Sequence, residues 1–119
     1  IGESDAQAED WLLDTKGSNY YYFNYLWEVL KRADYTAVMK PLDMKDEDVT
    51  VEALIKAAVL YGSAKTVTEK VLSLRERSGR FGTLLMASMD GTGENLQREH
   101  VSMRRLAEEV APAVRRAEA

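Results

Sequence analysis

The sequence predicts an α/β protein that is rich in helix and contains only part of a parallel strand–helix fold. Amphipathic helical segments alternate with short apolar stretches, and "FGTLLMAS" is an uninterrupted apolar run. The resulting order of strand, helix, strand and helix is typical of right-handed parallel β/α units. Two or three such strands cannot cover both faces and both edges of a sheet by themselves, so we expect the chain to be a piece of a larger fold.

Length and composition indicate one globular domain of ordinary size. The chain has 119 residues, of which 45% are hydrophobic and 30% are charged. The net charge of −4 argues against a general nucleic-acid-binding protein, because neutralising phosphates requires a basic surface. No apolar run reaches the roughly 18 residues that a membrane-spanning helix needs. The absence of cysteine excludes disulfides and thiolate sites in this chain, and it fits a cytoplasmic protein.

Residues 1–50 are expected to form a helical and connecting region. "IGESDAQAED" is read as a strand end followed by a helix, with Ser4 or Asp5 as its N-cap and Gly17 as its stop. In the next segment, apolar residues recur at helical spacing. These residues are Phe23, Leu26, Trp27 and Leu30. Residues 36–50 show no sustained period, so we expect an irregular connection there, either a plain surface excursion or a lid or binding loop.

Residues 51–119 are expected to form the last β/α units. Thr50 is the expected N-cap of a short helix. The expected apolar face of this helix consists of Ala53, Leu54, Ala57 and Ala58. "VLYGS" follows as a brief strand that ends at Gly62.

The next helix is expected to begin after the N-cap Ser63 and to end at Gly79, a residue that favours left-handed C-caps. "FGTLLMAS" is then expected to be a strand that is covered on both faces. After the turn "MDGTGEN", a final amphipathic helix begins near Glu94. Pro112 is expected to kink or end that helix, because proline lacks the backbone N–H.

A resemblance to a known family spans nearly the whole chain. It is sharpest in "DEDVTVEALIKAAVLYGSAKTVTEKVLSLRERSGRFGTLLM" and in "SMRRLAEEVAPAVRR". This series is similar to the C-terminal part of bacterial luciferase-like flavin-dependent monooxygenases. The resemblance implies the last part of a (β/α)8 TIM barrel, which needs about 250 residues when complete. Residues 1–119 would then be a single partial domain, and because no initiator methionine precedes Ile1 we expect further residues upstream of it.

The resemblance also implies an activity. Members of this family bind reduced FMN that a separate flavin reductase supplies, and they use O2 to oxidise a small organic substrate. We therefore expect a segment of such a monooxygenase, which is inactive in isolation and which associates with copies of itself as a homo-oligomer. The alternative is a non-catalytic helical dimerisation or interaction fragment derived from such a barrel.

Candidate site residues lie on two loops, because barrel active sites are built at the C-terminal ends of the strands. In "YGSAKTV", the free N–H groups at the helix start would suit a phosphate, so Ser63 and Thr66 are the candidate FMN-binding residues. Their alternative role is to cap the helix and fill its first turn. In "ASMDGTGEN", Met89 and Asp90 stand where the resemblance implies a substrate pocket; a simple Asp-Gly turn is the alternative.

No residue is assigned a catalytic or metal-binding role. His100 is the only histidine, and without a second histidine or a thiol nearby it cannot build a metal site by local spacing. Four tyrosines make the second helix aromatic on more than one face. We expect them to pack in a core or a dimer interface, with a flavin or substrate cleft as the alternative. They are Tyr20, Tyr21, Tyr22 and Tyr25.

Overall fold

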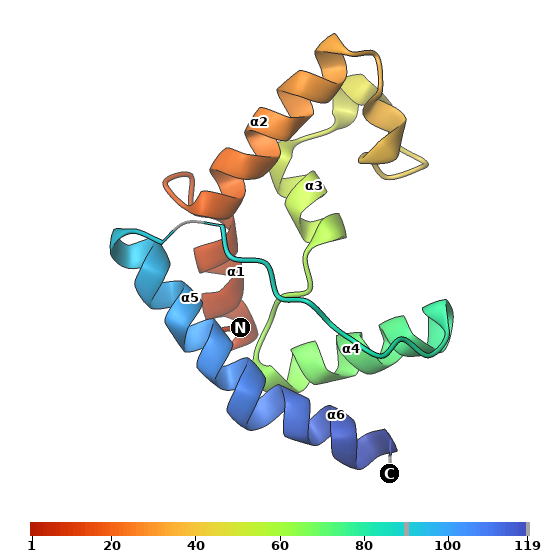
Figure 1. Cartoon of the computed structure of the whole chain (residues 1–119). Coiled ribbons are helices and arrows are strands. Elements are labelled where there is room, and N and C mark those ends of the chain that lie inside the picture. Colours follow the sequence, from red (N-terminus) through yellow and green to blue (C-terminus); the bar gives the residue numbers. More distant parts are fainter. Residues whose placement is uncertain (90, 119) are drawn as a thin grey trace. The chain divides into compact units, whose positions relative to one another are not determined.

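A computed structural model describes residues 1–89 and 91–118, which form helices joined by irregular segments (Figure 1). The chain divides into two compact units. One consists of Ile1–Trp11 with Leu60–Ala119, and the other of Leu12–Val59. The predicted richness in helix is confirmed. In the described ranges, no helix combines the length and the apolar character that crossing a membrane requires.

The unit Leu12–Val59 is built from α2 (Ser18–Arg32) and α3 (Val51–Ala58), which pack against each other. Two short 3-10 turns, η1 (Thr36–Val38) and η2 (Asp46–Asp48), lie in the irregular connection between these helices.

The start of α3 confirms the predicted cap. The Ala53 N–H donates to the Thr50 hydroxyl oxygen at 3.1 Å, which satisfies one of the free donors in the first turn of the helix.

The buried side chains of this unit differ in part from the prediction. Leu54 and Ile55 are 1% and 0% exposed, whereas Ala57 and Ala58 are exposed, so the expected apolar face of α3 is only partly right. The two large side chains remove more apolar area from water than two alanines would, and this difference sets which face turns inward. The other buried apolar side chains of the unit are Leu12, Phe23 and Trp27.

The other unit contains the start of α1 (Asp5–Leu13), then α4 (Ala64–Ser78), α5 (Gly93–Arg105) and, after α5, η3 (Leu106–Val110) and α6 (Ala111–Glu118). α4 packs against η3 and α6. The core of this unit consists of Val67, Val71 and Val110, with Ile1, Ala64, Leu106 and Val114 against it. Val67 and Val71 of α4 therefore face the last helical segments.

The helix ends follow local signals, with one correction. The Gln7 N–H donates to the Ser4 hydroxyl oxygen at 3.1 Å, so Ser4 is the N-cap of α1. The prediction that Gly17 stops α1 is wrong, because α1 ends at Leu13 and Gly17 is the N-cap residue of α2. Gly79 follows the last residue of α4 with a φ of +80°, a conformation that glycine adopts at little cost.

The predicted strands are the main error. Among the described residues, "VLYGS" forms only an isolated parallel bridge between Gly2 and Ser63, and residues 81–88 form neither strand nor helix. A strand needs a neighbour that completes its ladder of hydrogen bonds, and apolar residues alone do not supply one. Leu84 and Leu85 are accordingly 44% and 87% exposed. The (β/α)8 barrel and the self-association stay predictions.

Pro112 does not end the last helix, contrary to one of the two expectations for it. The chain remains helical to Glu118, and the turn before the proline, η3, is a π-helix. Proline offers no N–H to the carbonyl four residues earlier and its ring crowds that carbonyl, so a wider turn accommodates it.

We expect Leu54→Ala to lower the free energy of unfolding by about 2–5 kcal/mol, because it leaves a cavity beside α2. Leu42→Ala is the matched control, since Leu42 is 94% exposed, and it should change the stability by less than about 0.5 kcal/mol. Urea denaturation followed by circular dichroism measures both. Equal effects of the two substitutions would contradict the described core.

Candidate functional site

The turn before α4 is bound to the start of α1. The Ser63 N–H donates to Asp5 Oδ1 at 2.7 Å, and the Thr66 hydroxyl donates to Asp5 Oδ2 at 2.9 Å. Beside them, the Gly2 N–H donates to the Gly62 carbonyl oxygen at 3.0 Å. Two segments far apart in the sequence are therefore joined by both backbone and side-chain hydrogen bonds.

The structure brings the two candidate FMN-binding residues together at the start of α4. The Thr66 N–H donates to the Ser63 hydroxyl oxygen at 3.4 Å, so Ser63 caps the helix as predicted. The same two residues also bind the Asp5 carboxylate, which takes donors that a phosphate would need. A phosphate therefore does not fit this turn while Asp5 occupies it. The assignment of FMN binding to Ser63 and Thr66 stays a prediction.

Hydrogen bonding stabilises the charged form of Asp5. The Ser63 N–H is the largest cause that lowers the pKa of this carboxyl below its ordinary value of 3.8, followed by the hydroxyls of Thr66 and Ser63. The positive charge of Lys70 lowers the pKa further. Lys70 is itself held in place, because its Nζ donates to the Tyr61 carbonyl oxygen at 2.7 Å and lies 4.1 Å from the centre of the Tyr61 ring.

Glycine at position 62 is required by the geometry of this turn. Its φ is +141°, a backbone conformation that other residues rarely adopt. A Cβ at this position would lie 2.7 Å from Thr66 Cγ2 and 2.8 Å from Asp5 Oδ1. The absence of a side chain thus lets the Asp5 carboxylate reach the start of α4.

A second carboxylate binds the other candidate loop. The Met89 N–H donates to Glu99 Oε1 at 2.7 Å, and the Ser88 hydroxyl donates to Glu99 Oε2 at 2.7 Å. Asp90, the other candidate substrate-pocket residue, lies outside the described residues. The role of Glu99 was not predicted from the sequence, because a glutamate within a helix resembles any solvent-exposed charge until its partners ten and eleven residues away are known.

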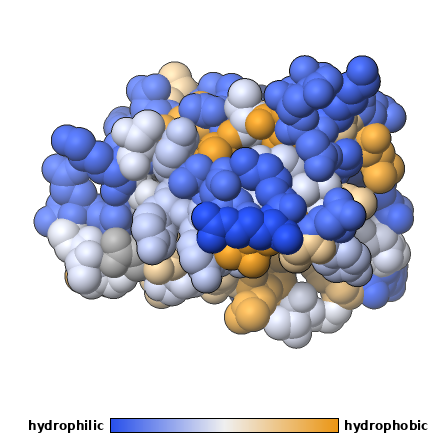
Figure 2. All heavy atoms as spheres, turned by 90° about the horizontal axis from the view of Figure 1, so that it is seen from above, coloured by the Kyte–Doolittle hydropathy of each residue, from blue (hydrophilic) through white to orange (hydrophobic). Residues whose placement is uncertain are grey.

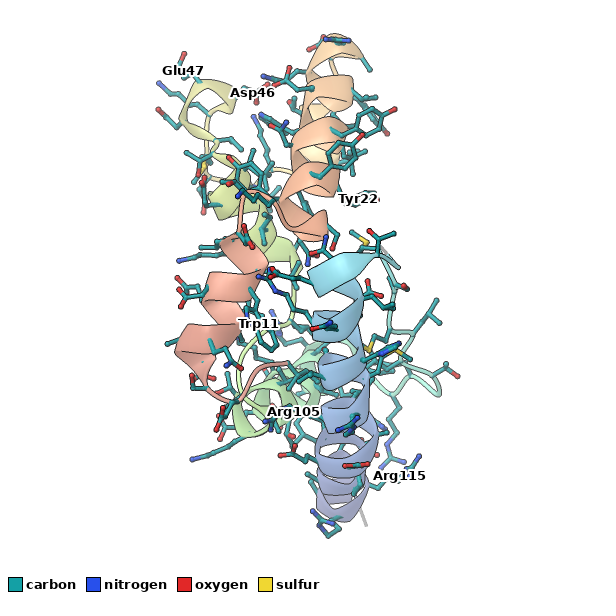
Figure 3. All side chains as sticks on the ribbon, turned by 90° about the vertical axis from the view of Figure 1, so that its left-hand side faces the viewer. Trp11, Tyr22, Asp46, Glu47, Arg105 and Arg115 are labelled. Atoms are coloured by element: carbon teal, nitrogen blue, oxygen red, sulfur yellow. The ribbon has the colours of Figure 1, made fainter. Side chains whose placement is uncertain are left out.

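A shallow groove of about 310 Å³ lies between α1 and the first turns of α5. Its lining consists of Trp11, Glu94, Gln97, Arg98 and Val101. The Arg98 guanidinium lies 5.9 Å from the centre of the Trp11 ring, and Figure 3 shows Trp11 projecting from α1. The groove combines an aromatic surface with charged groups, and it was not predicted from the sequence.

The remaining candidate residues are His100 and the tyrosines of α2. His100 is exposed, and among the described residues no three His, Asp or Glu side chains are placed to hold a metal ion. Tyr21 and Tyr25 are 74% and 59% exposed, so core packing is wrong for these two side chains. Figure 2 shows one face of the molecule, with apolar side chains exposed among hydrophilic ones.

The connection between α2 and α3 is held by a third carboxylate, Asp46, labelled in Figure 3. Asp46 accepts a hydrogen bond from the hydroxyl of the buried Thr36 at 2.8 Å, and Lys40 Nζ lies 2.5 Å from its other oxygen. Lys40, and after it Thr36, lowers the pKa of the Asp46 carboxyl. Hydrogen bonds and an ion pair therefore link the two parts of this connection to each other.

Comparison with known proteins confirms the resemblance to luciferase-like flavin-dependent monooxygenases: the chain is homologous to part of such a protein. The 2,5-diketocamphane 1,2-monooxygenase 1 of Pseudomonas putida is 30% identical over 118 residues, which cover 97% of this chain and 32% of that protein. The chain thus spans about a third of the length of this curated relative. No family model matches the chain.

The structural comparison agrees with the sequence comparison. The matched structure is the oxygenating constituent of 3,6-diketocamphane monooxygenase from Pseudomonas putida, a type II Baeyer–Villiger monooxygenase in complex with FMN. Its TM-score is 0.77 at 28% identity, and the match covers 94% of this chain and 31% of that one. Nearly all of the present chain therefore follows the fold of one part of a larger FMN-binding enzyme.

We expect Gly62→Ala to lower the free energy of unfolding by about 1–3 kcal/mol, because it combines a strained φ with contacts below 3 Å. Gly82→Ala is the matched control: no atom lies within 4 Å of its added Cβ. It should change the stability by less than about 0.5 kcal/mol. Thermal unfolding of both variants tests the difference, and equal stability of the two would contradict the described turn.

The lowered pKa of Asp5 predicts a pH dependence of stability. The hydrogen bonds to the ionised Asp5 carboxylate stabilise the fold fully above pH 3.8, the ordinary pKa of this carboxyl. This contribution is lost as the pH falls below 3.8 through the lower pKa of the folded state. Asp5→Asn should therefore be less stable than the unaltered protein at neutral pH and should approach it in acid. Denaturant titrations from pH ~7 to pH ~2 measure this convergence. Asp10→Asn, at an exposed position of α1, is the control and should change the stability at neutral pH by less than about 0.5 kcal/mol.

Proposed function

We propose that the chain is a segment of an FMN-dependent monooxygenase that oxidises a small organic substrate with O2 and reduced flavin. The observation that carries this proposal is the structural match, with a TM-score of 0.77 over 94% of the chain, to a monooxygenase in complex with FMN. The sequence relative at 30% identity is a monooxygenase as well. Both relatives are named for diketocamphanes, so a cyclic ketone is the substrate class that we propose.

The chain would contribute a wall of the substrate pocket. Met89 and its sequence neighbour Asp90 would be residues of that wall. Ser63 and Thr66 would join in FMN binding only after Asp5 releases their donors. FMN, when bound in the complete enzyme, would supply the redox chemistry, and the protein would position the substrate and exclude water.

Partners and assembly follow from the same proposal. A separate flavin reductase would supply reduced FMN, and the protein would act in the cytoplasm. The exposed apolar residues Leu84, Leu85 and Met86 support completion of the fold by further chain, either from the same polypeptide or from a second copy.

The second candidate function is a non-catalytic dimerisation or interaction fragment. The exposed aromatic face of α2 favours it, because Tyr21, Tyr25 and Val29 follow one another at four-residue steps and are all at least 40% exposed. A helix with such a stripe is suited to packing against another helix.

The test is an oxygenation assay on the complete polypeptide that carries this chain. With NADH, FMN, a flavin reductase and a bicyclic diketone, mass spectrometry should detect a product that is heavier by one oxygen atom. Omission of either the reductase or O2 should abolish the product, and the isolated chain should form none. Absence of both the product and flavin binding in the complete polypeptide, together with a stable dimer in sedimentation, would overturn the proposal in favour of the second function.

A further inference from the structure

We infer that Glu99 is a positioning residue, which holds the backbone at Met89 against α5 and thereby sets the shape of the substrate-pocket wall. This inference rests on the proposed function, because it requires that Met89 faces a substrate. It assigns a role to a helical glutamate that neither the spacing of the sequence nor its resemblance to a family indicates.

Both oxygens of the Glu99 carboxylate are engaged by consecutive residues of the loop. Oε1 accepts the Met89 N–H at 2.7 Å, and Oε2 accepts the Ser88 hydroxyl at 2.7 Å. One hydrogen bond would leave the loop free to rotate about it, whereas two bonds to one rigid carboxylate fix the direction as well as the position of the peptide. An ionised acceptor also makes such bonds shorter and stronger than a neutral one does.

The anchor formed by these two hydrogen bonds matters because the described part of the loop has no regular secondary structure. Residues 79–89 contain neither helix nor strand, and Leu85 in their middle is 87% exposed. At the far end, the Phe81 ring lies 5.5 Å from the Arg75 guanidinium. Glu99 itself lies within α5, whose intrahelical hydrogen bonds hold it in place. The carboxylate therefore ties a segment without regular structure to a rigid element, which is how a binding residue gains a defined position.

The expected consequence is an effect on substrate binding. Met89 has a flexible side chain that adapts to apolar ligands, so its useful position depends on its backbone. A loosened backbone would raise the cost of ordering the pocket wall around the substrate, and that cost would appear mainly in KM. The reacting atoms themselves would not lose a catalytic group.

Glu99→Gln is the sharp variant, because it keeps the size of the side chain and replaces one acceptor oxygen by an NH2 group that can only donate. The Met89 N–H then donates to a neutral amide oxygen, and the Ser88 hydroxyl turns to accept from the NH2 group, so weaker neutral bonds replace the charge-assisted ones. Glu109→Gln is the matched control: Glu109 follows on the same run of helix, and its partner is Arg105 at 2.9 Å. Ser88→Ala is a second variant, which removes one hydrogen bond from the loop side and leaves α5 unchanged.

The experiment measures hydrogen exchange at the Met89 amide and steady-state kinetics with a bicyclic diketone, both in the complete polypeptide. Glu99→Gln should speed the exchange by about tenfold, because neutral bonds replace charge-assisted ones, and Ser88→Ala by about threefold, because one hydrogen bond is lost. In Glu99→Gln, KM should rise about three- to tenfold while kcat changes less than about twofold. Glu109→Gln should leave both measurements unchanged.

Each contrary outcome has a distinct meaning. If the rate of hydrogen exchange at the Met89 amide is unchanged in both Glu99→Gln and Ser88→Ala, Glu99 does not hold this loop and the inference is wrong. Faster exchange with unchanged KM would overturn the positioning role while the proposed function stands. Absence of the reaction in the unaltered protein would overturn the proposed function and this role with it. If Glu99→Gln does not fold, as judged by circular dichroism, Ser88→Ala alone decides.

Discussion

The hydrogen bonds between Asp5 and the start of α4 are the interaction on which the unit Ile1–Trp11 with Leu60–Ala119 depends. They span 58 and 61 positions of the sequence and join the chain's first residues to its second half. The bond between the Gly2 N–H and the Gly62 carbonyl lies beside them. Closing a loop of this length costs conformational entropy, which local helix formation cannot offset. The carboxylate and the backbone bond together give that closure a fixed geometry.

The same interaction changes the meaning of a sequence signal. A serine after a glycine at the start of a helix is compatible with both an anion site and a simple N-cap. In this chain, Ser63 caps α4 and the anion is the protein's own Asp5. The free N–H and the positive end of the helix are thus used to hold the fold together. This use explains why a turn that resembles a phosphate site in its sequence has its donors already engaged.

How much the sequence could predict follows from the range of each interaction. The caps made by Thr50 and Ser63 were predictable, because the capping hydroxyl and the backbone N–H that donates to it are only three residues apart in the sequence. The strand expected at residues 81–88 does not form, since a strand requires a neighbouring strand, which the described residues do not contain. The hydrogen bond from Ser63 to Asp5 and the one from Met89 to Glu99 were not predicted, for a related reason. Their partners lie 58 and 10 positions away, and no local pattern identifies them.

The Asp5 and Glu99 carboxylates hold the two candidate loops through the same arrangement of hydrogen-bond donors. In each, a single carboxylate accepts one backbone N–H and one hydroxyl: Asp5 from Ser63 and Thr66, and Glu99 from Met89 and Ser88. Both anchors act at the end of a segment that was expected to be a strand. A strand in a complete sheet would fix the start of the following loop through its ladder. Here helix-borne carboxylates hold Ser63 and Met89 directly, so the backbone at these two candidate residues is fixed even though the apolar segment before each of them is not a strand.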